Sequence, residues 1–282
     1  MTQALAPDGG PSGLPPGLPP GLREHGVLLT VAYDGTAFSG WATQKDTRTV
    51  EEALRGAILA LDPRATSPRG CSRTDAGVHA EGQLAAFDAS LGMPPRGWVL
   101  QLNQNLPDDV CVRAARAVTV SYNPRFTSRK KRYRYLLVRD KVPDPLLRNR
   151  AWRVGFDMDM DKMVREARAI VGTHDFAAFR SARDVREVTV RNITSVEVAP
   201  VSCDPRLWSI TIEGNSFLYN MVRILVGTLV DVSRDVLPEG TIANALQATE
   251  RAVAGQTAPA HGLTLQHIDV ALPDDAGAPW PP

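Results

Sequence analysis

The sequence predicts an α+β protein built from two similar α/β halves, with largely antiparallel sheets and an active-site cleft between the halves. Two observations carry this prediction. Several strand-like segments follow one another without an intervening helix, and helix-like segments recur in a similar rhythm in both halves. The chain has 282 residues, which is enough for two cores. Its content of 43% hydrophobic and 22% charged residues is ordinary for a globular protein.

The N-terminal half is expected to span residues 26–140. Its first strand is predicted at residues 27–33, and Asp34 with Gly35 would end it. The sequence at residues 49–52 has the form of a capping box, and the helix behind it shows one apolar face. The remaining predicted elements are strands at residues 67–72, 83–87, 110–120 and 132–138, and a second helix at residues 94–103.

The C-terminal half is expected to span residues 141–282. Its first helix shows a clear apolar stripe at helical spacing. The predicted elements are, in order, a helix at residues 160–171, strands at 188–198 and 207–213, helices at 218–232 and 242–248, and a strand at 263–270. No strong internal sequence repeat accompanies this order, so the duplication rests on the order alone.

Residues 1–25 are rich in proline and glycine and repeat the pattern Gly-Leu-Pro-Pro. Such a segment cannot bury a core, so we expect a disordered leader, with a partner-binding tail as the alternative. The first residues lack a basic stretch followed by an apolar one, so no secretory signal is expected. The longest apolar stretch, residues 217–232, contains Arg223 and Asp231, which favours a buried helix over a membrane span.

The three cysteines, Cys71, Cys111 and Cys203, lie far apart in the sequence. Their spacing indicates neither a zinc site nor a disulfide framework, and it favours a cytoplasmic protein. The formal net charge is only +1, so the surface for any polyanionic partner must be local.

One short loop between predicted strands gathers Arg73, Asp75 and His79. By pattern alone, Asp75 is typical of a turn residue whose carboxylate bonds its own backbone. A carboxylate, a guanidinium and an imidazole converging on a loop between scaffold strands are, however, typical of a site. We expect His79 to be a structural hydrogen-bonding residue rather than a catalyst.

Residues 125–135 contain basic and aromatic side chains and no acidic one. On a strand, Tyr133 and Tyr135 share one face, while Arg132 and Arg134 take the other. Basic residues interleaved with aromatic ones suit RNA, because cations bind phosphates and rings stack on unpaired bases. A half-buried strand with a solvated basic face fits the pattern equally well.

Arg223 lies in an otherwise apolar segment. A buried guanidinium needs an anionic partner, because an unpaired buried charge is very costly. The side chain could instead extend to the surface, although apolar neighbours on every side make this harder. Asp75 is the candidate partner.

Several segments together resemble the TruA-type family of tRNA pseudouridine synthases. Residues 70–80, Gly-Cys-Ser-Arg-Thr-Asp-Ala-Gly-Val-His-Ala, are similar to the family's signature loop. The other matching segments, in the family's order, are residues 33–41, 103–107, 122–126, 133–135, 174–176, 191–193, 221–223 and 258–263. The resemblance covers about Leu28 to Val270. It departs from the family pattern at Ala42, where glutamine is usual, and at Pro124, where alanine is usual.

The resemblance implies an isomerase that converts uridine to pseudouridine in the anticodon stem-loop of tRNA, at tRNA positions 38 to 40, and that acts as a homodimer. Asp75 would be the covalent nucleophile, with its charge maintained by Arg223. Tyr133 would stack on the uracil and help to remove the C5 proton. Arg73 would hold the RNA backbone or fill the space left by a flipped base. No metal or organic cofactor is implied.

Two other functions fit parts of the sequence. A non-catalytic RNA-binding protein, such as a tRNA chaperone, would explain the basic run but not the simultaneous match of Asp75, Tyr133 and Arg223. A carboxylate-based glycosidase normally needs two carboxylates across the bond that it cleaves, whereas the loop around Asp75 offers one acid and an arginine.

Overall fold

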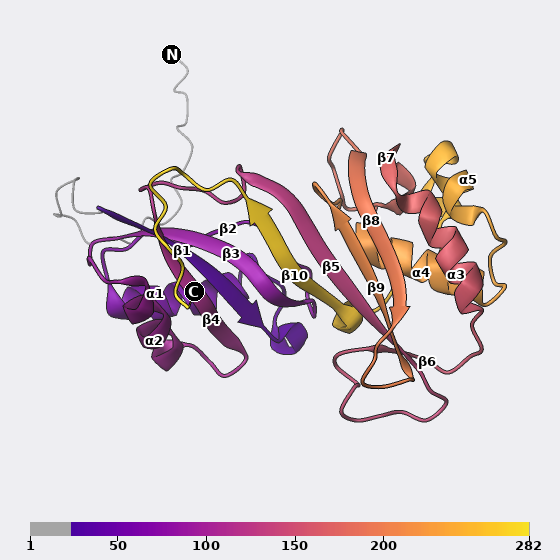
Figure 1. Cartoon of the computed structure of the whole chain (residues 1–282), viewed down its shortest axis with the longest axis horizontal. Helices are drawn as coiled ribbons and strands as arrows, with labels where there is room; N and C mark the ends of the chain where they lie inside the picture. The colour runs from indigo at the N-terminus through magenta and orange to yellow at the C-terminus, as the bar shows by residue number, and fades with distance from the viewer. Residues whose placement is uncertain (1–23, 282) are drawn as a thin grey trace, which may run out of the picture.

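The structure, a computed structural model, describes residues 24–281. Almost all of the predicted leader, residues 1–25, therefore lies outside the described residues. The described residues form one ten-stranded sheet in the order β4-β1-β3-β10-β5-β9-β8-β7, with β2 paired to β3 and β6 to β5 (Figure 1). Neighbouring strands are antiparallel, except that β10 runs parallel to β3 and β6 to β5. The predicted α+β class with a largely antiparallel sheet is confirmed.

The first half of the chain supplies five strands and two helices. They are β1 (His25–Tyr33), α1 (Val50–Leu61), β2 (Arg69–Gly70), β3 (His79–Ala89), α2 (Pro95–Asn105), β4 (Val110–Val118) and β5 (Ser128–Arg139). The strand predicted at residues 67–72 is shorter than expected, since Pro68 has no amide hydrogen to donate to a ladder. The strand predicted from residue 83 instead begins at His79, because β10 pairs with that end of it.

The second half supplies the remaining strands and three helices. They are β6 (Trp152–Val154), α3 (Met160–Ala167), β7 (Gly172–Asp175), β8 (Val190–Pro200), β9 (Leu207–Gly214), α4 (Met221–Ser233), α5 (Thr241–Ala248) and β10 (Leu263–Val270). Single 3-10 turns occur at Gly35–Ala37, Arg168–Ile170, Ala177–Phe179, Arg251–Val253 and Ala260–Gly262. The helix expected at residues 218–232 begins only at Met221, because Asn220 has a left-handed backbone with φ of 61°.

The predicted capping box at residues 49–52 is wrong. The Thr49 side chain makes no capping hydrogen bond, and its hydroxyl has no partner among the described residues. The first amides of α1 are already used, because Val50 N donates to Gly40 O at 3.2 Å and Glu51 N to Trp41 O at 3.0 Å. Backbone carbonyl groups of the preceding loop thus accept hydrogen bonds from the first amides of the helix, as a capping side chain would otherwise do.

Strand β10 joins the two halves of the molecule. It comes from the C-terminal end of the chain, yet it lies between β3 and β5 (Figure 1). The proposed boundary near residue 140 stays a prediction, and the hydrogen bonding of the sheet continues across it. After β10 the chain returns over the first half, and Trp280 forms an antiparallel bridge with Ala115 on the outer strand β4.

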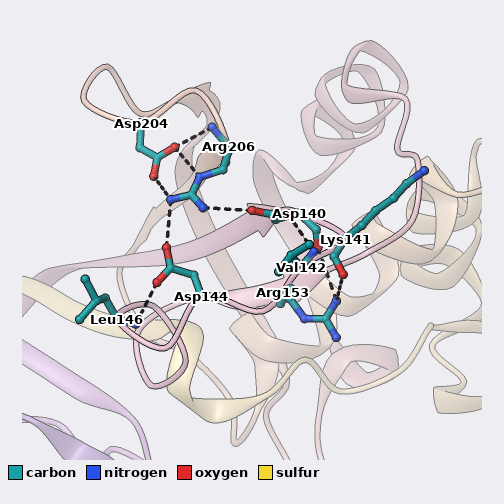
Figure 2. A network of polar contacts seen from close by, with 8 residues as sticks. All are labelled: Asp140, Lys141, Val142, Asp144, Leu146, Arg153, Asp204 and Arg206. Carbon is teal, nitrogen blue, oxygen red and sulfur yellow. Dashed lines mark hydrogen bonds and ion pairs between the residues drawn. The ribbon is translucent and has the colours of Figure 1, made fainter.

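A separate polar network orders the loop that follows β5. The Arg206 guanidinium donates to three carboxylates, at 3.0 Å to Asp140, 3.0 Å to Asp144 and 2.8 Å to Asp204 (Figure 2). A single exposed ion pair contributes little to stability, but one arginine shared by three acids fixes the relative positions of two loops.

Candidate active site

The Asp75 loop, residues 72–79, leads from β2 to the first residue of β3 and packs on the turn that follows β1. Trp41 N donates to Thr74 O at 3.1 Å, and Gly77 N donates to Phe38 O at 3.2 Å. The hydroxyls of Tyr33 and Thr74 lie 2.7 Å apart in the buried layer beneath the loop. Two segments that resemble the family in sequence therefore contact each other, and one holds the other in place.

Two glycines make this close packing possible. A Cβ atom at Gly35 would lie 2.1 Å from Val78 O, and one at Gly40 would lie 2.6 Å from Thr74 O. Gly40 also has a φ of +98°, a backbone conformation that side chains other than glycine rarely adopt. Any side chain at either position would push the turn away from the Asp75 loop.

Asp75 lies against Arg223, which comes from the first turn of α4. Arg223 Nη1 is 3.4 Å from Asp75 Oδ2, and each side chain is 18% exposed. The guanidinium is held from two other sides, because Nε donates to Ala258 O at 2.8 Å and Nη1 donates to Asn220 Oδ1 at 2.9 Å. The structure thus brings together two site residues that are 148 positions apart in the sequence.

The charge of Asp75 is set by two opposing influences. Burial raises the pKa of its carboxyl group, and the nearby Arg223 guanidinium lowers it. Burial is the larger influence, so the pKa of Asp75 is raised overall. Arg223 therefore limits the rise in pKa rather than reversing it.

Tyr133 lies on β5 beside this pair and is 7% exposed. Its hydroxyl is 3.1 Å from Ser72 Oγ, and its ring packs edge-on against Phe217 with a centroid distance of 5.1 Å. Burial raises the pKa of Tyr133 to about 12, the Ser72 hydrogen bond opposes this, and the charge of Asp75 adds to it. The phenol is therefore protonated at neutral pH.

Arg73 and His79 occupy the same loop but differ in environment. Arg73 is exposed, and its side chain has no hydrogen-bond or ion-pair partner among residues 24–281. His79 is buried, with Nδ1 accepting from Gly35 N at 3.1 Å and Nε2 lying 3.1 Å from His261 O. Both ring nitrogens of His79 are thus used by backbone groups, which is the arrangement of a structural histidine.

Sequence reasoning missed three side chains around the site. Ser72 bridges towards Tyr133, Phe217 packs on the Tyr133 ring, and Asn220 holds Arg223. Ser72 belongs to the segment that resembles the family's loop, and Asn220 precedes Arg223 by three residues, the spacing of one helical turn. Within the described residues, no group of three or more His, Cys, Asp or Glu side chains could hold a metal ion. No helix in that part of the chain is long and apolar enough to span a membrane.

The chain is similar to known proteins over most of its length. The sequence profile of the tRNA pseudouridine synthase family matches residues 29–127 and 167–269. A tRNA pseudouridine synthase A of Acetivibrio thermocellus is 39% identical over 242 residues, which is 86% of this chain and 98% of the relative. One of Geobacter sp. strain M21 is 40% identical over 86% of this chain and 97% of the relative.

A third relative, the tRNA pseudouridine synthase A of Bacillus licheniformis, is 40% identical over 85% of this chain and 96% of the relative. Among solved structures, one titled "Crystal Structure of a Cbf5-Nop10-Gar1 Complex" aligns with 85% of this chain and 58% of that chain, at 12% identity and a TM-score of 0.34. A likeness that remote carries no argument about function. By its sequence matches, the chain belongs to the family of TruA-type tRNA pseudouridine synthases, which are isomerases.

Proposed function

We propose that this protein isomerises uridine to pseudouridine in the anticodon stem-loop of tRNA, at tRNA positions 38 to 40, with Asp75 as the covalent nucleophile. The observation that supports the assignment of Asp75 is its contact with Arg223 beside Tyr133. A carboxylate on a loop, a fixed cation and a buried phenol are the groups that an addition to a nucleotide and a proton removal require.

The reaction replaces the bond between uracil N1 and ribose C1′ with a bond between uracil C5 and ribose C1′. The target base leaves the stack, because its atoms cannot be reached inside a helix. The ionised Asp75 adds to the ribose C1′ or to the uracil C6, the bond between N1 and C1′ breaks, and the uracil turns. A bond then forms between C5 and C1′, C5 loses its proton, N1 gains one, and Asp75 leaves.

Three side chains assist in this proposal. Arg223 orients Asp75 and limits the rise in its pKa. Tyr133 borders the uracil, and because its phenol is protonated, it accepts the C5 proton only while it passes its own proton to the adjacent Ser72 hydroxyl. Ser72 in turn releases its proton to solvent, from which N1 takes one up. Arg73, which is exposed on the same loop, contacts the RNA where the base has left the stack.

A glycosidase is less consistent with this arrangement. The charged group that contacts Asp75 is an arginine, whereas a glycosidase normally places a second carboxylate across the bond. The homodimeric state and the cytoplasmic location that the resemblance and the cysteine spacing imply remain part of the proposal. Light scattering during gel filtration would test the first of them.

The central test is the substitution Asp75→Ala. We expect no pseudouridine from the variant, because it lacks the carboxylate that adds to the nucleotide. Its affinity for tRNA should stay within about twofold of the wild type, since Asp75 bears no positive charge for the phosphates. The substrate is tRNA that lacks anticodon-loop modifications, and pseudouridines are mapped by nucleotide. Asp235→Asn, at an exposed carboxylate paired with Lys162, is the control and should leave activity unchanged.

Two results would contradict the proposal. Pseudouridine made by the Asp75→Ala variant would remove Asp75 as the nucleophile. Modification by the wild type outside tRNA positions 38 to 40 would overturn the proposed target while leaving the reaction in place.

A further inference from the structure

The basic residues of β5 fall into two groups according to their partners. Lys130 and Arg132 both form ion pairs with Glu213 on β9, and Arg134 forms one with Glu81 on β3 at 2.6 Å. Each of these three residues therefore has an acidic partner within the protein, although Lys130 and Arg132 share one carboxylate. These ion pairs account for part of the basic pattern of the segment without any RNA.

Lys131 differs from these neighbours. It alternates with them along the strand and shares the face of Tyr133. Its Nζ donates to Ser72 Oγ at 3.3 Å, and the same hydroxyl lies 3.1 Å from the Tyr133 hydroxyl. Within residues 24–281, Lys131 forms no ion pair with a carboxylate.

The charges around Lys131 are positive. Burial lowers the pKa of its ammonium group, the Cys71 thiol opposes this, and the guanidinium groups of Arg125 and Arg186 lower it further. Arg186 is compensated by Asp184, whereas the exposed Arg125 side chain has no acidic partner among the described residues. A half-buried ammonium that has two guanidinium groups near it and no carboxylate partner among the described residues is unfavourable unless an anion completes the site.

We propose that Lys131, with Arg125 at the rim, binds a phosphate group of the RNA substrate and so positions the nucleotide whose base meets Tyr133 and Asp75. This inference rests on the proposed function, because the anion is taken to be the substrate's own. A lysine binds phosphate as a point charge, and phosphate contacts set the register in which a nucleic acid lies. Ser72 links this subsite to the loop of Asp75, three residues away.

The first experiment measures RNA affinity without turnover. Unmodified tRNA is titrated into Asp75→Ala and into the double variant Asp75→Ala/Lys131→Met over a range of salt concentrations. We expect Lys131→Met to weaken binding about tenfold, as for the loss of a hydrogen bond to a charged group. The magnitude of the slope of log affinity against log salt concentration should also decrease by about one, as for the loss of one phosphate contact. Lys131→Arg should restore most of the affinity, because it keeps the charge.

Lys130→Met is the matched control on the same strand. Glu213 remains paired with Arg132 in this variant, so neither the affinity nor the salt dependence should change. An equal loss for Lys130→Met and Lys131→Met would mean that the strand contributes only a diffuse positive field, and it would overturn the proposed subsite.

The second experiment alters the RNA instead of the protein, so that it does not depend on the folding of a variant. Stem-loop RNAs carry one uncharged methylphosphonate at a time around the target uridine. We expect one such RNA to bind the Asp75→Ala protein about tenfold more weakly. The same RNA should cause little further loss with the Lys131→Met double variant, because the two changes remove one contact. Additive losses at every position would contradict the proposal.

Turnover separates phosphate binding from proton transfer. A phosphate contact predicts a higher KM for Lys131→Met and its rescue by Lys131→Arg. A lower kcat at saturating RNA, unchanged affinity and no rescue by arginine would instead make Lys131 the end of a proton path through Ser72, and would overturn the proposal. Wild-type protein that binds tRNA through Lys131 but makes no pseudouridine would refute the proposed function and leave the phosphate subsite standing.

Discussion

Asp75 can be recognised as a candidate residue from the sequence, but the protonation state of its carboxyl group cannot be inferred from the sequence. Its loop is distinctive in the sequence, but the direction of its pKa shift follows from burial, which raises it, and from Arg223, which lowers it. Both influences come from residues that are distant in the chain. The sequence led us to expect that Arg223 keeps the carboxylate ionised, and the structure shows that burial has the larger effect on its pKa.

The pH dependence of activity should report this balance. Asp75 must be ionised to attack, so activity should fall as the pH drops through its raised pKa. Arg223→Gln removes the influence that lowers this pKa, so the rising limb of kcat/KM should move to higher pH. Turnover should also fall by about 100-fold, as for the loss of an electrostatic contact in an active site.

Arg223→Lys is the corresponding control, because it keeps a positive charge near Asp75. Its rising limb should lie between those of the wild type and of Arg223→Gln. A limb that stays in place in both variants would show that Arg223 does not act on the charge of Asp75.

At the scale of secondary-structure elements, helix α4 places Arg223 beside Asp75. The segment at residues 256–258 lies directly on this helix, since a Cβ atom at Gly227 would come 1.9 Å from Gln256 O. The same segment both accepts from and donates to Arg223, through Ala258 O and Ala258 N. The fit between helix and segment therefore fixes the guanidinium.

Gly227→Ala should disturb this fit. The added methyl group cannot be accommodated unless the backbone at Gln256 moves, so we expect a loss of about 1–3 kcal/mol in the free energy of unfolding. Pseudouridine formation should fall as well, because the anchors of Arg223 shift. Urea titration and initial rates measure the two effects.

Gly56→Ala is the control for helix propensity. Gly56 lies within α1, and no atom lies within 4 Å of the position where its Cβ would be. This variant should gain about 0.5–1 kcal/mol of stability with unchanged activity. If Gly227→Ala behaved in the same way, the close contact at α4 would not constrain the site.

The whole molecule depends on strands that are distant in the sequence. Strand β10, the last strand, lies between β3 and β5, and the residues after it return to the outer strand β4. There Trp280 pairs with Ala115, and the Arg96 guanidinium lies 5.8 Å from the centroid of the Trp280 ring. The tail therefore covers an edge whose unpaired amides could pair with another chain.

Two truncations should separate the role of β10 within the sheet from the role of the residues after it, which cover the edge of β4. A chain that ends at Val270 keeps β10, so we expect it to fold and retain its specific activity, with a Tm lower by about 2–4 °C and more aggregation. A chain that ends at Gly262 lacks a central strand and should not form a stable sheet. Thermal melting followed by circular dichroism, together with gel filtration, measures both outcomes. An unchanged Tm and the same solubility in the first truncation would show that the tail does not protect β4.

The sequence by itself determined the fold class and most strands and helices, because hydrophobic periodicity and turn residues act locally. It also contained the segments that place the chain in its family. It also singled out Asp75, Arg73, Tyr133 and Arg223 as candidates, although their roles stay proposals. The capping box failed for a non-local reason, since carbonyls from another loop already satisfied the amides of α1.

Only the tertiary structure decided which charges are compensated and which are not. The basic run on β5 appears uniform in the sequence, yet Glu213 and Glu81 pair with Lys130, Arg132 and Arg134 and leave Lys131 without an acid among the described residues. The tertiary structure also decided the contact between Asp75 and Arg223 and the position of β10 within the sheet. Desolvation and ion pairing depend on which distant segments meet, and that information appears only once the sheet has formed.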